Sequence, residues 1–191
     1  MILETLICSL NSNEEINVAP FGIKKKKDLV VISPYLPSRT HENLLNNEYA
    51  SVNYVDDVSL FVNCFLNKQK FKLKRCSLIR GFFLSEALSH QEVKVIDYKK
   101  NNLRPSFYCK IVYFKNHAPF LGFNRARHAL LEACILASRI KILKKEKILN
   151  ELNYLSMAVE KTSGTKEISL WNDIKNFIMA EIHKNAKNQS R

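Results

Sequence analysis

The sequence predicts an α+β protein, with strands in its first two thirds and helices in its last third. Between residues 1 and 114, short segments rich in Val, Ile, Phe and Tyr are separated by polar turns, which is typical of strands. From residue 124 onward the apolar residues recur three or four positions apart, which is the period of a helix. With 191 residues, 46% of them hydrophobic, the chain is long enough to bury a core.

The first predicted strands form a hairpin. Residues 1–10 are apolar and β-branched, and residues 16–23 are extended up to a proline that favours a break in the ladder. Polar residues 11–15 form the turn between them. The run KKKKD at 24–28 is expected at a loop tip, and the continuous Val and Ile of residues 29–33 predict a strand buried on both faces.

A short helix is expected over residues 38–47. Ser38 or Thr40 can cap its start, and Glu42 in the first turn suits the positive end of the helix dipole. The proline-rich segment before it ends the preceding strand.

The middle of the chain continues with strands and one further helix. A strand over 49–55 precedes an amphipathic helix over 58–66. Residues 67–80 are basic and weakly patterned, so we expect a connection there. Two more strands follow over 92–98 and 106–114, the latter with alternating side chains.

Three helices complete the chain, over residues 126–143, 145–161 and 167–184. The first carries a narrow face of small residues, which lets a helix approach its neighbour closely. This change of pattern predicts two parts, residues 1–120 and residues 121–191.

The chain is basic, since 30 Lys and Arg against 18 Asp and Glu give a formal net charge of +12. Residues 1–95 hold 12 basic and 10 acidic residues (net +2), and residues 96–191 hold 18 and 8 (net +10). With 22 Lys but 8 Arg, 19 Asn and 16 Ile, the composition also favours a drift toward A+T-rich codons. Charge alone therefore does not define a nucleic-acid interface.

Glycine and cysteine exclude several kinds of site. Four glycines, none close to another, cannot build a P-loop or a dinucleotide-binding loop. Five scattered cysteines show no C-x-x-C pair or zinc spacing, so we expect reduced core residues and no metal. The acidic start of the chain is unlike a signal peptide, and no apolar run is long enough for a membrane span, so we expect a cytoplasmic protein.

Ser38, Arg39 and Thr40 form the most informative cluster. At a helix start, free backbone N–H groups, hydroxyls and a guanidinium together favour binding of a phosphate. A capped helix with a solvent-exposed arginine is the competing interpretation of the same residues.

Four segments in order resemble the signature blocks of a mainly archaeal family, domain of unknown function 447, within the FMN-binding split-barrel superfamily. They are NVAPFGI (17–23), SRTHENL (38–44), ASVNYVDD (50–57) and FNRARHALLEACILASRI (123–140). The resemblance covers the chain from the first strand to at least Ile140, which is more specific than any single block. Segment 67–80 matches no part of it.

The resemblance implies a split β-barrel of about six mostly antiparallel strands in residues 1–120. It also implies a helical C-terminal extension, residues 121–191, packed on the barrel or on a partner, and a homodimer with flavin mononucleotide (FMN) at each subunit junction. The positions expected to hold the phosphate and ribityl chain are Ser38, Arg39, Thr40 and Asn43. Those expected along the flavin ring are Asn17, Ala19, Pro20, Phe21, Val52 and Asn53.

The fourth block has a less defined role, either in the pocket or at the dimer interface. It comprises Asn124, Arg125, Ala126, Glu132 and Ala133. Arg125, Glu132 and Arg139 recur every seven residues, so they share one helix stripe, where they can pair with one another or remain solvated.

The function expected from this resemblance is FMN binding, with flavin-dependent oxidoreductase activity on an unidentified small molecule. A non-catalytic carrier or sensor of flavin or pterin is the alternative. Nucleic-acid binding through the basic stretch 139–147 is disfavoured, because the stretch lacks interleaved aromatics and basic residues near a helix C-terminus already suit the dipole. The five histidines are scattered, and no catalytic residue is assigned.

Overall fold

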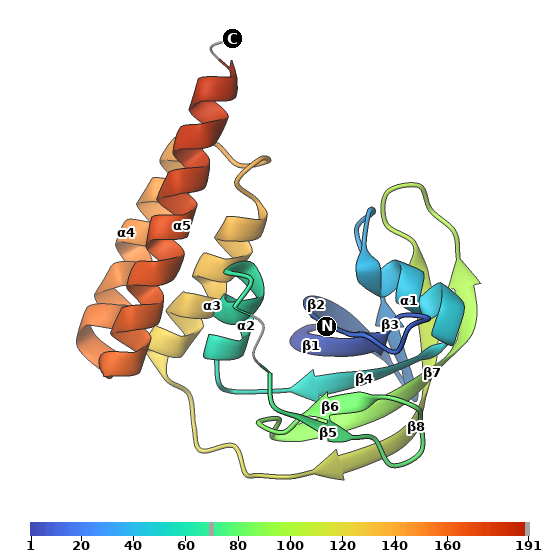
Figure 1. Ribbon diagram of the computed structural model, residues 1–191. Coiled ribbons are helices and arrows are strands. Elements are labelled where there is room, and N and C mark those ends of the chain that lie inside the picture. Colours follow the sequence, from blue (N-terminus) through green and yellow to red (C-terminus); the bar gives the residue numbers. More distant parts are fainter. Residues whose placement is uncertain (69–70, 190–191) are drawn as a thin grey trace. The chain divides into compact units, whose positions relative to one another are not determined.

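The computed structural model describes residues 1–68 and 71–189 (Figure 1). The chain divides into two compact units, one of residues 1–56 and 70–120 and one of residues 57–69 and 121–191. The segment 57–69 thus groups with the C-terminal helices, although it lies between barrel strands in the sequence.

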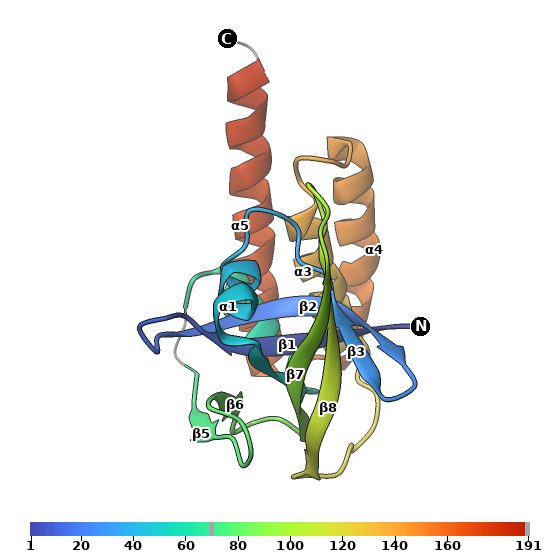
Figure 2. The ribbon, with the colours of Figure 1, turned by 90° about the vertical axis from the view of Figure 1, so that its right-hand side faces the viewer.

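Six antiparallel strands of the first unit close into a barrel in the order β1-β2-β3-β8-β7-β4. This confirms the predicted α+β class and the barrel that the family resemblance implies. β7 and β8 form a long pair that faces the viewer in Figure 2. The strands are β1 (Ile2–Leu10), β2 (Ile16–Lys26), β3 (Leu29–Ile32), β4 (Tyr49–Tyr54), β7 (Ser89–Lys99) and β8 (Ser106–Asn116).

The lysine run is not the loop that the sequence predicts. Lys24, Lys25 and Lys26 continue β2 and pair with β3, with Lys24 opposite Val31. The turn itself is Lys27 and Asp28, and Lys27 has a positive φ of 50°. The lysines are exposed, so pairing of the backbone overrides their low strand propensity.

The prediction of a basic connection over 67–80 is also wrong in part. Leu73–Arg75 forms β5, which pairs with β6 (Phe82–Leu84) in a separate two-stranded sheet. Strands of three residues are too short to show alternation, and tertiary contacts hold this hairpin in place, as described below.

A cluster of buried apolar side chains fills the barrel interior. Leu44, from helix α1 (Arg39–Asn47), is 1% exposed and belongs to this cluster, so the apolar face of α1 packs on the barrel. The other buried members are Ile7, Ile23, Val30, Ile32, Ala50, Val52, Val93, Phe107 and Cys109.

The second unit is helical. It contains α2 (Ser59–Phe65), α3 (Arg125–Ser138), α4 (Lys145–Thr162) and α5 (Thr165–Gln189). The predicted small-residue face of α3 is buried at Ala126, Ala129 and Ala133, and α3 packs on both α4 and α5. None of the described helices combines the length and apolar character that crossing a membrane requires.

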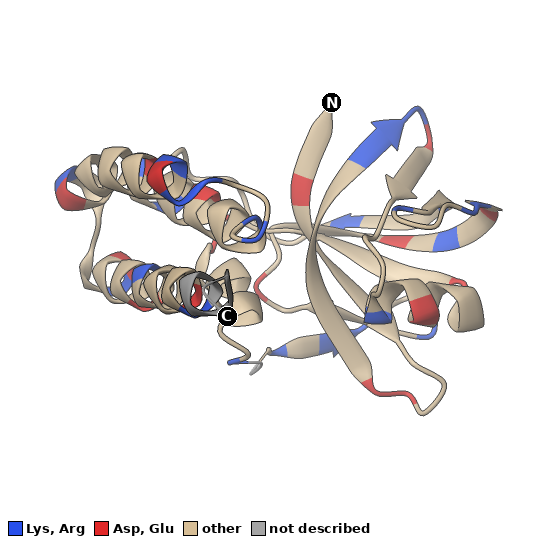
Figure 3. Ribbon diagram, turned by 90° about the horizontal axis from the view of Figure 1, so that it is seen from above, with Lys and Arg blue, Asp and Glu red and all other residues tan. Residues whose placement is uncertain are grey.

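The dipole argument for the basic stretch 139–147 does not hold. Helix α3 ends at Ser138, not at residue 143, and Lys145 and Lys147 lie in the first turn of α4, where cations oppose the dipole. Figure 3 shows basic and acidic segments interspersed along the helices.

Candidate functional site

The start of helix α1 is the first part of the candidate site. Ser38 has an extended backbone and caps the helix, its Oγ accepting the backbone N–H of His41 at 3.4 Å. The N–H groups of Arg39 and Thr40 come before the first intrahelical hydrogen bond, and Arg39 is exposed. Two N–H groups without an intrahelical acceptor, a hydroxyl and a guanidinium therefore meet at one helix end.

Two side-chain hydrogen bonds fix α1 to the barrel. Asn17 on β2 donates its amide N–H to the Thr40 hydroxyl at 2.9 Å, and Asn43 donates to the Ser9 hydroxyl on β1 at 2.9 Å. Thr40 and Asn43 are 1% and 5% exposed. The fold thus brings together Asn17, Thr40 and Asn43 at one end of the barrel. The buried Thr40 and Asn43 side chains hold α1 against β2 and β1.

His41 adds a further anchor. Its Nε2 lies 3.0 Å from the Tyr98 hydroxyl on β7, and its ring packs edge-on against Phe107 at a centroid distance of 5.6 Å. Ser9 and Tyr98 are supports that the sequence did not reveal, because they lie more than 30 residues from their partners and in segments without a distinctive pattern.

Strand β2 provides a second surface next to α1. Asn17, Ala19 and Phe21 alternate onto one face of β2, and Pro20 lies on the other. All four are half-buried. Phe21 packs against the barrel core, and the small Ala19 lies between Asn17 and Phe21 on that face.

Val52 and Asn53 lie deeper than the other candidates, and both are 0% exposed. Val52 belongs to the barrel core. The Asn53 side chain donates to the Leu6 carbonyl at 3.0 Å and accepts the Leu84 N–H at 2.8 Å. Asn53 therefore ties β6 to the barrel. Because both side chains are fully buried, neither can contact a ligand bound on the surface of this chain.

The fourth block lies in the helical unit. Asn124 caps α3, its Oδ1 accepting the Arg127 N–H at 3.0 Å while its amide donates to the Thr162 carbonyl at 3.0 Å. Arg125 is exposed and, with Asn124, lines an apolar groove of about 500 Å³ between α3 and α4. The block is completed by buried Ala126 and Ala133 and half-buried Glu132.

The predicted helix stripe of Arg125, Glu132 and Arg139 is not continuous, because Arg139 lies outside the helix. Arg139 follows the last turn of α3 as its C-cap, because the helix ends earlier than predicted. An ion pair of α3 that the structure records runs instead to another helix, from Arg127 to Glu167 of α5 at 3.5 Å.

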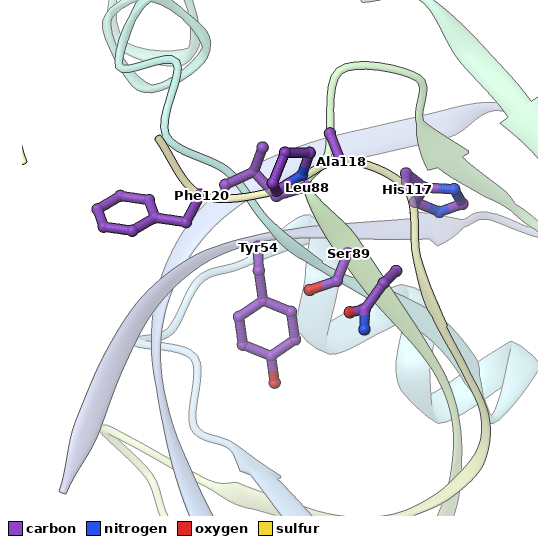
Figure 4. Close-up of a pocket in the computed structure, with 8 residues that line it drawn as sticks. Tyr54, Leu88, Ser89, His117, Ala118 and Phe120 are labelled. Atoms are coloured by element: carbon purple, nitrogen blue, oxygen red, sulfur yellow. The ribbon is translucent and has the colours of Figure 1, made fainter. Parts of the chain in front are cut away.

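A pocket of about 590 Å³ lies at the other end of the barrel. Tyr54, Ser89 and Asn116 are register partners on β4, β7 and β8, and Figure 4 shows the side chains of Tyr54 and Ser89 directed to the same side. Along β4 this pocket is four residues, or about 13 Å, from Ala50 at the α1 end, so it is separate from the α1 site. No pattern in the sequence predicts this pocket.

The fold and the comparisons agree on the class of protein. The closed six-stranded antiparallel barrel has the fold of a solved protein from Shewanella frigidimarina, described as having a split barrel domain, which aligns with a TM-score of 0.54 and 14% identity over 60% of this chain and 66% of that chain. The chain belongs to the family described as protein of unknown function (DUF447), matching its N-terminal domain over residues 3–118 and its C-terminal domain over residues 124–176.

Solved structures of similar fold include several flavin proteins. An FMN-bound DUF447 protein from Methanosarcina mazei aligns with a TM-score of 0.77 and 23% identity over 92% of this chain and 94% of that chain. The 2-nitrobenzoate 2-nitroreductase of Pseudomonas fluorescens aligns with a TM-score of 0.54 and 23% identity over 60% and 64%. Flavoredoxin from Methanosarcina acetivorans aligns with a TM-score of 0.54 and 14% identity over 63% and 72%. No curated protein matches the sequence.

Proposed function

We propose that this protein binds FMN, with the phosphate at the start of helix α1. The observation that carries the proposal is the exposed Arg39 beside the Ser38 cap, on a helix that two side-chain hydrogen bonds hold against β1 and β2. The FMN-bound relative from Methanosarcina mazei, which aligns over almost the whole chain, supports FMN as the ligand.

The donors at this helix end fit a phosphate. Backbone N–H groups and the helix dipole favour an anion, the Ser38 hydroxyl can donate, and the guanidinium of Arg39 can form paired hydrogen bonds with two phosphate oxygens. In this proposal Asn43 and Thr40 hold the helix in position, and Val52 and Asn53 support the strands beneath it without touching the ligand.

The flavin ring is proposed to lie along β2. Asn17, Ala19 and Phe21 present an amide, a small methyl group and an aromatic ring on one face, next to the end of α1. The Asn17 amide, which donates to Thr40, keeps a carbonyl oxygen that can accept a hydrogen bond from the ligand.

We also propose a flavin-dependent oxidoreductase that acts as a homodimer on a small molecule. Bound FMN supplies hydride or electron transfer at its own ring. The chain's residues bind and orient the cofactor and exclude water. The nitroreductase and flavoredoxin of similar fold support redox chemistry over a non-catalytic carrier.

The experiment is the absorption spectrum of the purified full-length protein after desalting and addition of FMN. The proposal predicts flavin bands that remain with the protein and a particle mass of two chains by light scattering. Colourless protein that retains no added FMN would contradict flavin binding. Anaerobic reduction of the bound flavin by NADH or NADPH, faster than that of free FMN, distinguishes the oxidoreductase from a carrier.

A further inference from the structure

The hairpin β5–β6 brings three metal-binding side chains together on the outside of the barrel. His90 and Glu92 are two residues apart on β7, so both point to the same face, and Cys76 lies in the turn that follows β5. The Cys76 sulfur, a ring nitrogen of His90 and a carboxylate oxygen of Glu92 all lie within 4.8 Å of one another. We propose that these three residues bind a zinc ion.

The separation of His90 and Glu92 also matches that of two ligands of one metal ion. His90 Nε2 and Glu92 Oε1 are joined by a long hydrogen bond of 3.4 Å. Zinc bonds of about 2.1 Å to nitrogen and oxygen in a tetrahedral arrangement place those two atoms about 3.4 Å apart. The same geometry needs sulfur about 3.6 Å from each, so the half-buried Cys76 thiol has to move by about 1.2 Å at most.

The Glu92 carboxylate is held in place by three backbone hydrogen bonds and points its remaining position at His90. It accepts the backbone N–H groups of Ser77, Leu78 and Ile79 at 2.5, 2.7 and 3.0 Å. Of about four acceptor positions on a carboxylate, three are thereby used. The fourth, on Oε1, faces His90 Nε2 at 3.4 Å and is the position that a metal would take over. The same three bonds fix the turn that carries Cys76 to β7.

His90 is oriented as zinc-binding histidines are. Its Nδ1 lies 2.8 Å from Nε2 of His117, so an Nδ1–H donated to His117 leaves the Nε2 lone pair facing Glu92. Phe83 of β6 stacks on the His90 ring at 4.0 Å with an interplanar angle of 6°, and on His117 at 4.9 Å. The His90 and Glu92 side chains are 1% and 0% exposed, whereas Cys76 is half-buried. With three protein ligands, a water or a solute takes the fourth position of a tetrahedral zinc.

The donor set of sulfur, nitrogen and oxygen excludes calcium and magnesium, which take only oxygen, and suits zinc, which binds all three donor types. Burial, together with the nearby Glu92 and Cys8, raises the pKa of the Cys76 thiol to about 12. Zinc would displace that proton, and the thiolate and carboxylate together balance its charge. Spacing rules cannot find such a site, because Cys76 and His90 are 14 residues apart and meet only through the hairpin.

The test uses full-length protein without a histidine tag, stripped with a chelator and titrated with Zn²⁺ by calorimetry. We expect one equivalent to bind with submicromolar affinity, and Cys76→Ser to weaken it at least 100-fold. Cys64→Ser, another partly buried cysteine, is the matched control and should bind as the wild type does. No stoichiometric binding by the wild type, or equal binding by Cys76→Ser, would overturn the proposal.

Two further measurements identify the ligands. Co²⁺ in place of zinc should give a thiolate-to-cobalt charge-transfer band in the wild type and in Cys64→Ser but not in Cys76→Ser; absence of the band from the wild type would also overturn the site. His117→Phe keeps the stacking on Phe83 and removes the acceptor for His90, so we expect 10- to 100-fold weaker zinc binding. An unchanged affinity would contradict this role of His117. Zinc binding is independent of the flavin proposal, and either can fail without the other.

Discussion

Asn53→Ala is predicted to destabilise the barrel by about 2–4 kcal/mol. The substitution leaves the Leu84 N–H, buried in β6, without its acceptor at 2.8 Å, and an unpaired buried N–H costs about 1–3 kcal/mol. It also removes the bond from the Asn53 amide to the Leu6 carbonyl, worth about 1 kcal/mol net. The effect is local because these bonds join β1, β4 and β6 alone.

Amide hydrogen exchange under native conditions measures this prediction strand by strand. Exchange protection should fall by that amount at Leu84 and in β1 and β4. The single tryptophan, Trp171, is buried in the helical unit, so its fluorescence-monitored unfolding in urea serves as an internal comparison. Asn153→Ala on an exposed position of α4 is the matched control and should stay within about 0.5 kcal/mol. Loss of less than about 1 kcal/mol at Leu84 would refute the role assigned to Asn53.

Three further predictions concern both units. Burial alone would raise the pKa of Asp57, but Lys166 at 2.8 Å and the Ser59 hydroxyl and N–H outweigh it and hold the pKa below its ordinary value of 3.8. The stability that ionised Asp57 contributes is therefore complete at pH values above 3.8 and is lost as the pH falls through the lower folded-state pKa. Between pH 6 and 3, the unfolding midpoint of Asp57→Asn should therefore decline less than that of the wild type. Ala133→Leu adds volume to a fully buried position of α3 and should cost about 1–3 kcal/mol in urea unfolding followed by Trp171 fluorescence, so an unaffected midpoint would argue against close packing there. Thr40→Val removes the acceptor for Asn17 at nearly constant volume and should lower exchange protection of α1 by about 1 kcal/mol, which an unchanged α1 would contradict.

The sequence predicts elements well where a pattern extends over several turns or strand residues. Helix α1 follows its Ser38 cap, and the small-residue face of α3 is buried as expected. The errors lie where tertiary contacts override local preference. Pairing with β3 keeps Lys24–Lys26 in a strand, and Glu92 and Asn53 hold a hairpin whose strands are three residues long.

In the candidate site, too, local patterns predict some residues and tertiary contacts determine the others. Spacing alone placed Ser38, Arg39 and Thr40 at a helix end, and the strand positions of Asn17 and Phe21 came from the family resemblance. The supports could not be predicted, because Ser9 and Tyr98 reach α1 from distant strands through single hydroxyls. The burial of Asn53 was equally hidden, since an asparagine in an alternating strand gives no sign that its amide holds another strand.

The most direct measurement of the central claim compares FMN with riboflavin, which lacks the phosphate, on wild type and Arg39→Ala. We predict that the wild type binds FMN more tightly than riboflavin, and that Arg39→Ala weakens FMN alone by roughly 10- to 150-fold, as expected for one charge-assisted contact of about 1.5–3 kcal/mol. Arg80→Ala, which removes an exposed arginine paired with Glu14, is the control and should leave both affinities unchanged. Equal affinities for FMN and riboflavin in the wild type, or no loss of FMN affinity in Arg39→Ala, would contradict a phosphate site at the start of α1.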